Sequence, residues 1–185
     1  MLSRIDHIGI ACRDLDASVE FYRSAYGFEP VHREVNEEQG VEEVMLRVCG
    51  TDDGGASWIQ LLHPTRPDSP VAKWMERHGE GVHHVAFGTS DVAADAEAIR
   101  GRGVRVLYDE PRRGSMGSRI TFLHPKDCGG VLTELVTSAA HGAHAAPPAG
   151  TDPDADASGQ VAAPGQVAAP GRAWAPGAAD APEQG

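Results

Sequence analysis

Two histidines occupy equivalent places in two similar segments of the chain. The segment IDHIGIA (residues 5–11) is echoed by VHHVAFG (residues 82–88), so that His7 corresponds to His84 at an offset of 77. Such an echo indicates two copies of one structural unit. Because side chains alternate between the two faces of a strand, each histidine shares a face with apolar residues. One such histidine is usually a hydrogen-bonded core residue, whereas two at equivalent places could bind a ligand together.

An amide and a carboxylate stand on comparable apolar faces near the end of each copy. Gln60 follows His7 by 53 residues, and Glu134 follows the second histidine by 50. A pseudo-twofold axis between the copies would bring the four polar groups together. Imidazole nitrogens with carboxylate and carbonyl oxygens suit a divalent ion of intermediate hardness, such as cobalt, nickel, zinc, manganese or iron. A six-coordinate ion held in this way would keep two exchangeable positions.

Glu43 and the remaining histidines have simpler interpretations at this point. Glu43 lies on the face of its strand that also carries Arg47, and this pattern favours a surface ion pair, with a catalytic role as the alternative. The histidines without such symmetry, interpreted as surface or structural residues, are His63, His78, His83 and His124. Neither Ser57 nor Cys49 has a base at a readable spacing, so nucleophilic catalysis has little support.

Both copies predict the same order of elements, βαβββ. In the first copy the expected strands are 5–12, 28–35, 41–49 and 58–63, with a helix that begins after Asp14 and ends at Gly27. In the second copy they are 82–89, 104–108, 118–123 and 131–136, with a helix after Asp91. Aspartate is a good N-cap and glycine a common helix end. Ser69 followed by proline predicts a connecting helix that extends to residue 78.

The expected fold class is therefore α+β, with two tandem βαβββ modules and a tail. We place the first module at 1–68, the connecting helix at 69–80, the second module at 81–138 and the tail at 139–185. The last 45 residues contain 15 Ala, 7 Gly and 7 Pro. Such a composition cannot bury enough apolar surface to offset its ordering entropy. We expect this Ala/Pro/Gly-rich tail to be disordered.

Charge and cysteine content exclude several classes of protein. The formal net charge is -11, from 16 basic and 27 acidic residues, which disfavours nonspecific nucleic-acid binding. Three cysteines without CxxC spacing argue against a disulfide framework or a zinc ribbon, and favour a reducing compartment. The chain shows neither a signal-peptide pattern nor a run of roughly 18 apolar residues. We expect a cytoplasmic protein with no nucleic-acid or membrane partner.

One segment carries the opposite charge to the rest of the chain. Between Arg100 and Lys126 there are seven basic residues and only two acidic ones, Asp109 and Glu110. A solvated face with chance clustering is the simpler interpretation. A binding surface for a polyanionic ligand is the alternative.

With these residues in place, the chain resembles the vicinal oxygen chelate (glyoxalase/bleomycin-resistance) superfamily, whose paired βαβββ modules form a metal-binding cup. Within it, the sequence is similar to the methylmalonyl-CoA epimerase family. The matching segments span residues 3 to about 137 and include GEGVHHVAF (79–87), FLHPK (122–126) and GGVLTEL (129–135). These runs are more specific than the two histidines, which the whole superfamily shares.

The resemblance implies roles for particular side chains. It implies that a divalent metal, cobalt first and nickel, manganese or zinc as alternatives, is held by His7, Gln60, His84 and Glu134. It implies that Glu43 is a catalytic base, and Glu134 is the candidate for the second proton-transfer group. The substrate is expected to contact Arg113, Ser115, Gly117 and Lys126. The family often has glutamate at the position of Gln60, so this site is one charge unit more positive.

The implied activity is metal-dependent epimerisation of (2R)- and (2S)-methylmalonyl-CoA. The proton at C2 is removed and one is returned on the opposite face, through a metal-stabilised enolate. An acyl-CoA is then the expected small-molecule partner, and analogy with the fold implies a homodimer. The alternatives are a glyoxalase-type lyase or isomerase, a ring-cleaving dioxygenase, and a non-enzymatic drug-sequestering protein of the same fold. A fourth ligand at Gln60 speaks against the dioxygenase, because it would occupy a position that oxygen chemistry needs.

Overall fold

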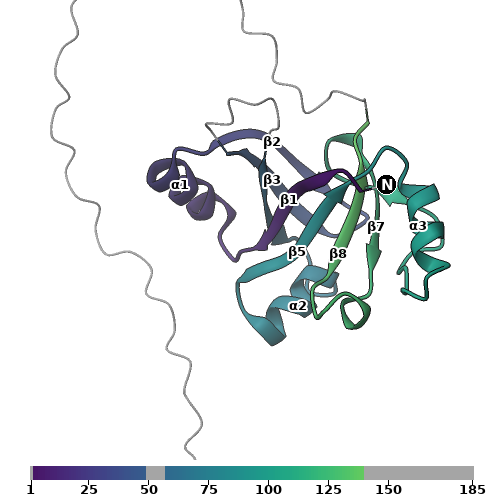
Figure 1. Cartoon of the computed structure of the whole chain (residues 1–185). Helices are drawn as coiled ribbons and strands as arrows, with labels where there is room; N and C mark the ends of the chain where they lie inside the picture. Colours follow the sequence, from purple (N-terminus) through teal and green to yellow (C-terminus); the bar gives the residue numbers. More distant parts are fainter. Residues whose placement is uncertain (1, 49–56, 140–185) are drawn as a thin grey trace, which may run out of the picture. The chain divides into compact units, whose positions relative to one another are not determined.

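The computed structural model describes residues 2–48 and 57–139 of the 185-residue chain. Two βαβββ units follow each other, with one helix between them (Figure 1). In chain order the elements are β1 (Arg4–Ala11), α1 (Leu15–Tyr26), β2 (Glu29–Asn36), β3 (Val41–Arg47), β4 (Trp58–Pro64), α2 (Pro70–His78), β5 (Gly81–Gly88), α3 (Val92–Arg100), β6 (Arg112–Arg113), the 3-10 helix η1 (Ser115–Gly117), β7 (Arg119–Leu123), the 3-10 helix η2 (Pro125–Asp127) and β8 (Thr133–Thr137). The predicted α+β fold of two tandem modules is confirmed.

The helices begin and end at their capping residues. The Asp14 carboxylate accepts a hydrogen bond from the backbone N–H of Ala17 at the start of α1, and Asp91 caps α3 in the same way. Ser69 caps α2 immediately before its proline. Gly27 ends α1 in the left-handed conformation with a φ of 72°, which glycine adopts without a steric penalty. These local signals explain why the predicted helix positions agree with the structure.

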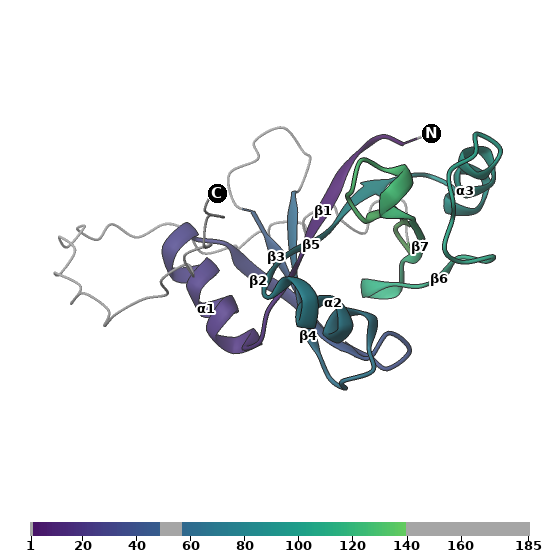
Figure 2. The same cartoon turned by 90° about the horizontal axis from the view of Figure 1, so that it is seen from below.

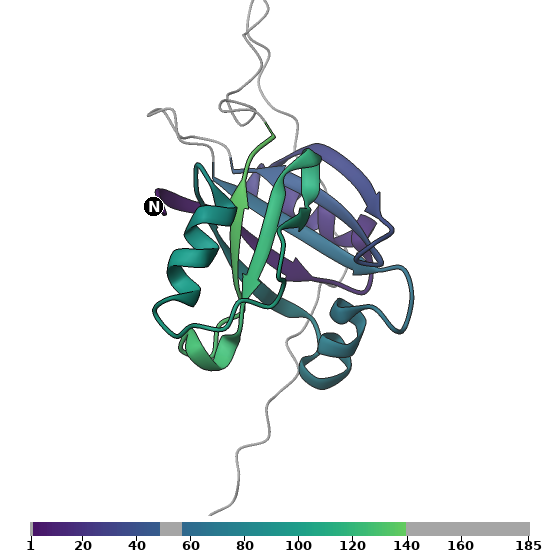
Figure 3. The same ribbon diagram turned by 90° about the vertical axis from the view of Figure 1, so that its right-hand side faces the viewer.

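The eight strands of the described residues join in one curled sheet, in the order β2-β3-β4-β1-β5-β8-β7-β6. The modules meet in its middle, where β1 and β5 pair antiparallel. Each of these two strands also pairs in parallel with the last strand of its own module, β4 or β8. Figure 3, which views the molecule from the side of α3, shows β7 and β8 in front of the strands of the first module. The inner faces of the two halves therefore enclose a cup.

Two helices cover the outer face of the sheet. Helix α1 packs on the first module in a buried cluster that includes Leu15 and Leu46, and α3 packs on the second module in a cluster that includes Val92 and Leu135. Figures 1 and 2 show these helices at opposite ends of the sheet. Because Leu46 faces α1, the strand alternation directs Glu43 of the same strand into the cup.

The strand predicted at 104–108 is wrong. This segment forms a single bridge between Val106 and Leu123. The strand that pairs with the free edge of β7, on the side away from β8, is the short β6. The apolar side chains of Val104 and Val106 pack instead in the cluster beneath α3. Burial against a helix therefore accounts for the apolar pattern that suggested a strand.

The expectations about the tail, the cysteines and a membrane span can be compared with the structure only within the described residues. The predicted tail lies outside them from position 140 onward, and so does Cys49. Within the described part of the chain, Cys12 and Cys128 are free thiols. No helix of that part combines the length and the apolar character that crossing a membrane requires.

Candidate active site

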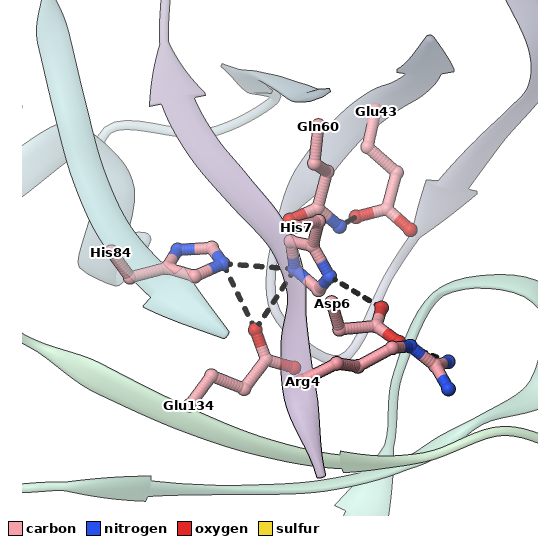
Figure 4. Close-up of polar contacts among 7 residues, drawn as sticks. All are labelled: Arg4, Asp6, His7, Glu43, Gln60, His84 and Glu134. Atoms are coloured by element: carbon pink, nitrogen blue, oxygen red, sulfur yellow. Dashed lines mark hydrogen bonds and ion pairs between the residues drawn. The ribbon is translucent and has the colours of Figure 1, made fainter. Parts of the chain in front are cut away.

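Three side chains converge inside the cup: His7 from β1, His84 from β5 and Glu134 from β8 (Figure 4). The Nε2 atoms of the two histidines lie 3.2 Å apart. Glu134 Oε2 lies 2.9 Å from Nε2 of His84 and 3.2 Å from Nε2 of His7. All three residues are buried. Two imidazole nitrogens and a carboxylate oxygen at such separations form a donor set for a divalent cation.

The pairing of the central strands explains this convergence. Gly9 lies opposite His84 and Ala86 lies opposite His7 in the β1–β5 register, while β8 places Glu134 beside Ala86. Position 9 has no room for a side chain, because a Cβ built on Gly9 would lie 2.2 Å from Cε1 of His84. Gly9 therefore provides the space that the His84 ring occupies.

Each histidine has a further partner at its Nδ1 atom. Asp6 Oδ1 lies 3.1 Å from Nδ1 of His7, and Arg4 Nη2 donates a hydrogen bond to Asp6 Oδ2 at 2.7 Å. In the second module, Nδ1 of His83 lies 3.0 Å from Nδ1 of His84. Partners of this kind fix the tautomer and the orientation of a ligating imidazole. Equivalent positions thus carry a carboxylate in one module and an imidazole in the other.

The buried groups of the cluster change each other's pKa values. Burial opposes a charge on His7, but the carboxylates of Glu134 and Asp6 outweigh it and raise the pKa of His7 to about 9. Burial would raise the pKa of Glu134, but the two histidines, above all His7, lower it to about 2. Burial dominates at His84 and lowers its pKa. At neutral pH the cluster therefore keeps Glu134 ionised and His84 neutral, which are the protonation states that metal ligands require. His7 carries a proton at that pH, and a cation that binds there would have to displace it.

Gln60 and Glu43 lie side by side on β4 and β3. Gln60 Nε2 donates a hydrogen bond to Glu43 Oε2 at 2.8 Å, and both residues are buried. Figure 4 places this pair across His7 from Glu134. Among the described residues, the buried Gln60 Oε1 has no hydrogen-bond partner. A buried carbonyl oxygen in this state is costly unless a ligand engages it, so the observation fits a fourth oxygen ligand.

The interpretation of Glu43 as a surface partner of Arg47 is wrong. Glu43 is 3% exposed, and Arg47 forms its ion pair with Glu29. Burial raises the pKa of Glu43 to about 8; the Ser115 side chain acts to lower this pKa, and the carboxylates of Glu34 and Glu134 act to raise it. A buried carboxylate with such a raised pKa is typical of a group that transfers protons.

An open pocket, whose empty space of about 320 Å³ includes open solvent, connects Glu43 and Gln60 with His84 and Glu134 of the cluster. Its lining includes Glu43, Gln60, His84 and Glu134, and Ser115 from the loop after β6. A carboxylate with a raised pKa and a metal-type donor cluster thus share one solvent-accessible space. This arrangement suits the removal of a proton beside a group whose negative charge a cation stabilises.

The residues expected to contact the substrate are not all in the pocket wall. Ser115 lines the pocket, whereas Arg113 at the end of β6 and Gly117 at the end of η1 are exposed. Lys126 is exposed on η2 and is not part of the lining. The structure therefore brings His7, His84 and Glu134 together, places Glu43 and Gln60 beside them, and leaves Lys126 apart.

Two residues that contact the cluster were not predicted from the sequence. Asp6 had no predicted role, and His83 was interpreted as a surface or structural residue, although it lines the pocket. The repeat contained the signal, because each residue immediately precedes one of the paired histidines. Successive side chains of a regular strand point to opposite faces, so their contacts with the histidine Nδ1 atoms depend on the local shape of β1 and β5.

The curled pair of βαβββ units and the donor cluster define a class of protein whose cup carries side chains of the metal-ligand type. The family model of the Glyoxalase/Bleomycin resistance protein/Dioxygenase superfamily matches residues 6–122. The chain therefore belongs to this superfamily.

Its relatives within the superfamily include methylmalonyl-CoA epimerases. Ethylmalonyl-CoA/methylmalonyl-CoA epimerase of Cereibacter sphaeroides is 34% identical over 137 residues, which are 73% of this chain and 98% of that protein. A structure of a Streptomyces coelicolor methylmalonyl-CoA epimerase variant in complex with 2-nitronate-propionyl-CoA is 75% identical, with a TM-score of 0.72 over 76% of this chain and 100% of its own. A methylmalonyl-CoA epimerase in complex with methylmalonyl-CoA and NH4+ is 76% identical, with a TM-score of 0.72 over 76% of this chain and 97% of its own. The predicted resemblance to this family of isomerases is confirmed.

Proposed function

We propose that this protein interconverts (2R)- and (2S)-methylmalonyl-CoA by removing and returning the proton at C2. The observation that carries the proposal is the shared pocket, in which Glu43 lies beside His84 and Glu134 of the donor cluster. The complexes of related epimerases with methylmalonyl-CoA and with 2-nitronate-propionyl-CoA support an acyl-CoA as the substrate.

Glu43 is the proposed base for one face of C2. The C2 proton lies between a thioester and a carboxylate, so its removal needs an acceptor that is fixed in place before the substrate arrives. Gln60 holds Oε2 of the Glu43 carboxylate at 2.8 Å, which sets the direction of the other oxygen. A base whose pKa is near the working pH can accept the proton and also return it.

Glu134 is the proposed proton-transfer group for the opposite face. Its Oε2 atom is the oxygen directed at the two histidines. A carboxylate that binds a cation through one oxygen keeps the other for proton transfer. Inversion at C2 then uses two carboxylates, Glu43 from the first module and Glu134 from the second.

The proposed metal ligands are His7, Gln60, His84 and Glu134. When bound, a divalent ion polarises the substrate oxygens and stabilises the negative charge that develops as the proton leaves. The donor set supports cobalt as the proposed ion, with nickel, manganese and zinc as alternatives. Asp6 and His83 would then orient the two ligating imidazoles through their Nδ1 atoms.

The segment that carries Arg113, Ser115 and Gly117 is the proposed contact for the substrate carboxylate. Lys126 is the proposed contact for a more distant part of the acyl-CoA, whose phosphates attract cationic side chains. The homodimer and the cytoplasmic location stay predictions.

The test is epimerisation in deuterated water by metal-free and cobalt-loaded protein. Chelation is expected to abolish turnover, and cobalt is expected to restore both epimerisation and deuterium incorporation at C2. A cobalt-loaded protein that leaves both epimers unchanged would overturn the proposed activity. Undiminished activity in a verified metal-free sample would reject the metal-assisted mechanism alone.

A further inference from the structure

Glu34 connects the two edges of the sheet. Strands β2 and β6 stand at opposite ends of the strand order, yet Glu34 of β2 reaches the loop that follows β6. Arg113 Nη2 donates a hydrogen bond to Glu34 Oε2, and the backbone N–H of Met116 donates one to Glu34 Oε1, both at 2.9 Å. A single carboxylate of the first module thus holds both the last side chain of β6 and the backbone of the loop that follows it in the second module.

The Glu34 carboxylate is well enclosed for a residue of an edge strand. Only 15% of its side chain is exposed. Burial acts to raise the pKa of Glu34, but the Met116 N–H, the neighbouring Glu43 side chain and the Arg113 guanidinium together lower it. An ionised acceptor forms stronger hydrogen bonds than a neutral one. Glu34 is therefore suited to hold the loop as a carboxylate.

The loop has a backbone shape that needs external support. Met116 has a φ of 55° and is the one non-glycine residue with positive φ among those the structure describes. Gly114 allows a close approach to the sheet, because a Cβ built there would lie 2.5 Å from Cγ2 of Ile120. A sparsely populated backbone conformation persists only where the surroundings hold it. The hydrogen bond to Glu34 is one such contact, and it acts on the N–H of Met116 itself.

Glu34 lies close to the candidate active site, so its contact with the loop can affect the pocket. Glu34 lies directly opposite Glu43 in the β2–β3 pairing, and Ser115 lines the pocket next to Met116 in the chain. We propose that Glu34 is a positioning residue that holds the Ser115 loop (residues 114–118, between β6 and β7) over Glu43, acting through the N–H of Met116. The effect on rate rests on the proposed epimerase function. Without Glu34 the loop loses this anchor, and Ser115 no longer stays at the pocket wall beside the base.

The test compares Glu34→Ala and Glu34→Gln with the matched control Glu38→Ala. Glu38 also forms an ion pair between the modules, with Arg112 at 3.2 Å, but both side chains are about half exposed. The measurements are hydrogen exchange of the Met116 amide by NMR, cobalt content, thermal unfolding, and kcat and KM for methylmalonyl-CoA. Together they distinguish an opened loop from a damaged metal site or a destabilised fold.

We expect Glu34→Ala to speed exchange of the Met116 amide by about tenfold or more, as the loss of a hydrogen bond to a charged group implies. We also expect kcat to fall by about tenfold, with unchanged cobalt content. Glu34→Gln keeps an acceptor for Met116, so it should slow the exchange again and recover most of kcat. Glu38→Ala should match the wild type in every measurement.

Unchanged exchange of the Met116 amide in Glu34→Ala would overturn the proposal, and so would faster exchange with an unchanged kcat. A wild-type protein without epimerase activity would be a failure of the proposed function. The exchange measurement would still decide whether Glu34 holds the loop. If Glu34→Ala does not fold, Glu34→Asp shortens the side chain by one methylene and carries the same expectations.

Discussion

The two βαβββ modules form the same architecture around the cup but supply different chemistry to it. Gln60 lies opposite Gly9 in the β1–β4 pairing, and Glu134 lies opposite Ala86 in the β5–β8 pairing. These places are equivalent in the repeat. The first module therefore offers a neutral amide at the point where the second offers a carboxylate.

On the strands next to these, the first module has the carboxylate and the second does not. Gln60 pairs with Met45 of β3, and Glu43 lies two residues before Met45. Glu134 pairs with Phe122 of β7, and Ile120 lies two residues before Phe122. Each module thus places one carboxylate in the cup, at different points. The repeat explains the paired histidines, and the departures from it make the cup asymmetric, as inversion at a single carbon requires.

Among the changes that separate the two modules, removal of the Glu43 carboxylate should have the largest effect on the epimerisation rate. Glu43→Gln keeps the shape of the side chain but removes its basicity, so the rate should fall by about 10²-fold or more. Cobalt content and thermal unfolding should stay unchanged. Deuterium wash-in at C2, measured from each epimer separately, should slow more for one epimer than for the other.

The matched control for this change is Glu42→Gln on the same strand. Glu42 pairs with Arg33 at 2.8 Å and is not part of the pocket lining, so the rate should be normal. Equal slowing from both epimers in Glu43→Gln would favour a single-base mechanism. A normal rate would remove Glu43 from the mechanism.

A methyl group at position 9 should displace His84, the histidine of the second module, and leave His7 of the first module in place. In Gly9→Ala the new Cβ collides with the His84 ring, and we expect cobalt affinity to fall by about tenfold or more. Ala86→Gly removes a methyl group at the equivalent place and should keep that affinity. Calorimetric titration with cobalt checks both variants, and an unchanged affinity in Gly9→Ala would contradict the steric argument.

The Nδ1 partners of the two histidines should differ in their importance. Asp6 carries a charge that supports His7, whereas burial and the neighbouring His84 lower the pKa of His83 to about 3, so its imidazole is neutral. We expect Asp6→Asn to weaken cobalt binding by about tenfold, and His83→Asn to weaken it less. Competition against a metal-binding dye gives both affinities, and a larger effect of the His83 change would reverse this ranking.

Ile120 should show the smallest effect, because the second module places an apolar side chain in the pocket wall where the first module places Glu43. Ile120→Val removes one methylene from a side chain that is 2% exposed, and the free energy of unfolding should fall by about 0.5–1.5 kcal/mol. Urea denaturation measures this change. The epimerisation rate should stay within a few-fold of the wild type, and a hundredfold loss would show that the position does more than pack.

The histidine pair and most elements could be predicted because they follow local rules. Strand alternation placed His7 and His84 on faces that turned out to be buried. Asp14 and Gly27 marked the ends of α1. The secondary structure of residues 104–108 could not be predicted from local rules. An apolar stretch can be buried as a strand in the sheet or as an irregular segment beneath a helix, and its sequence does not distinguish the two.

The sequence by itself determined the repeat, the two modules and the residue types available for a metal and a base. Only the tertiary structure decided that Glu43 is buried beside Gln60, that Asp6 and His83 contact the paired histidines, and that Glu34 holds a loop of the other module. Alternation along a strand separates one face from the other. Which of the faces is covered depends on segments that are distant in the chain, and here the loop after β6 packs beside β2 and β3.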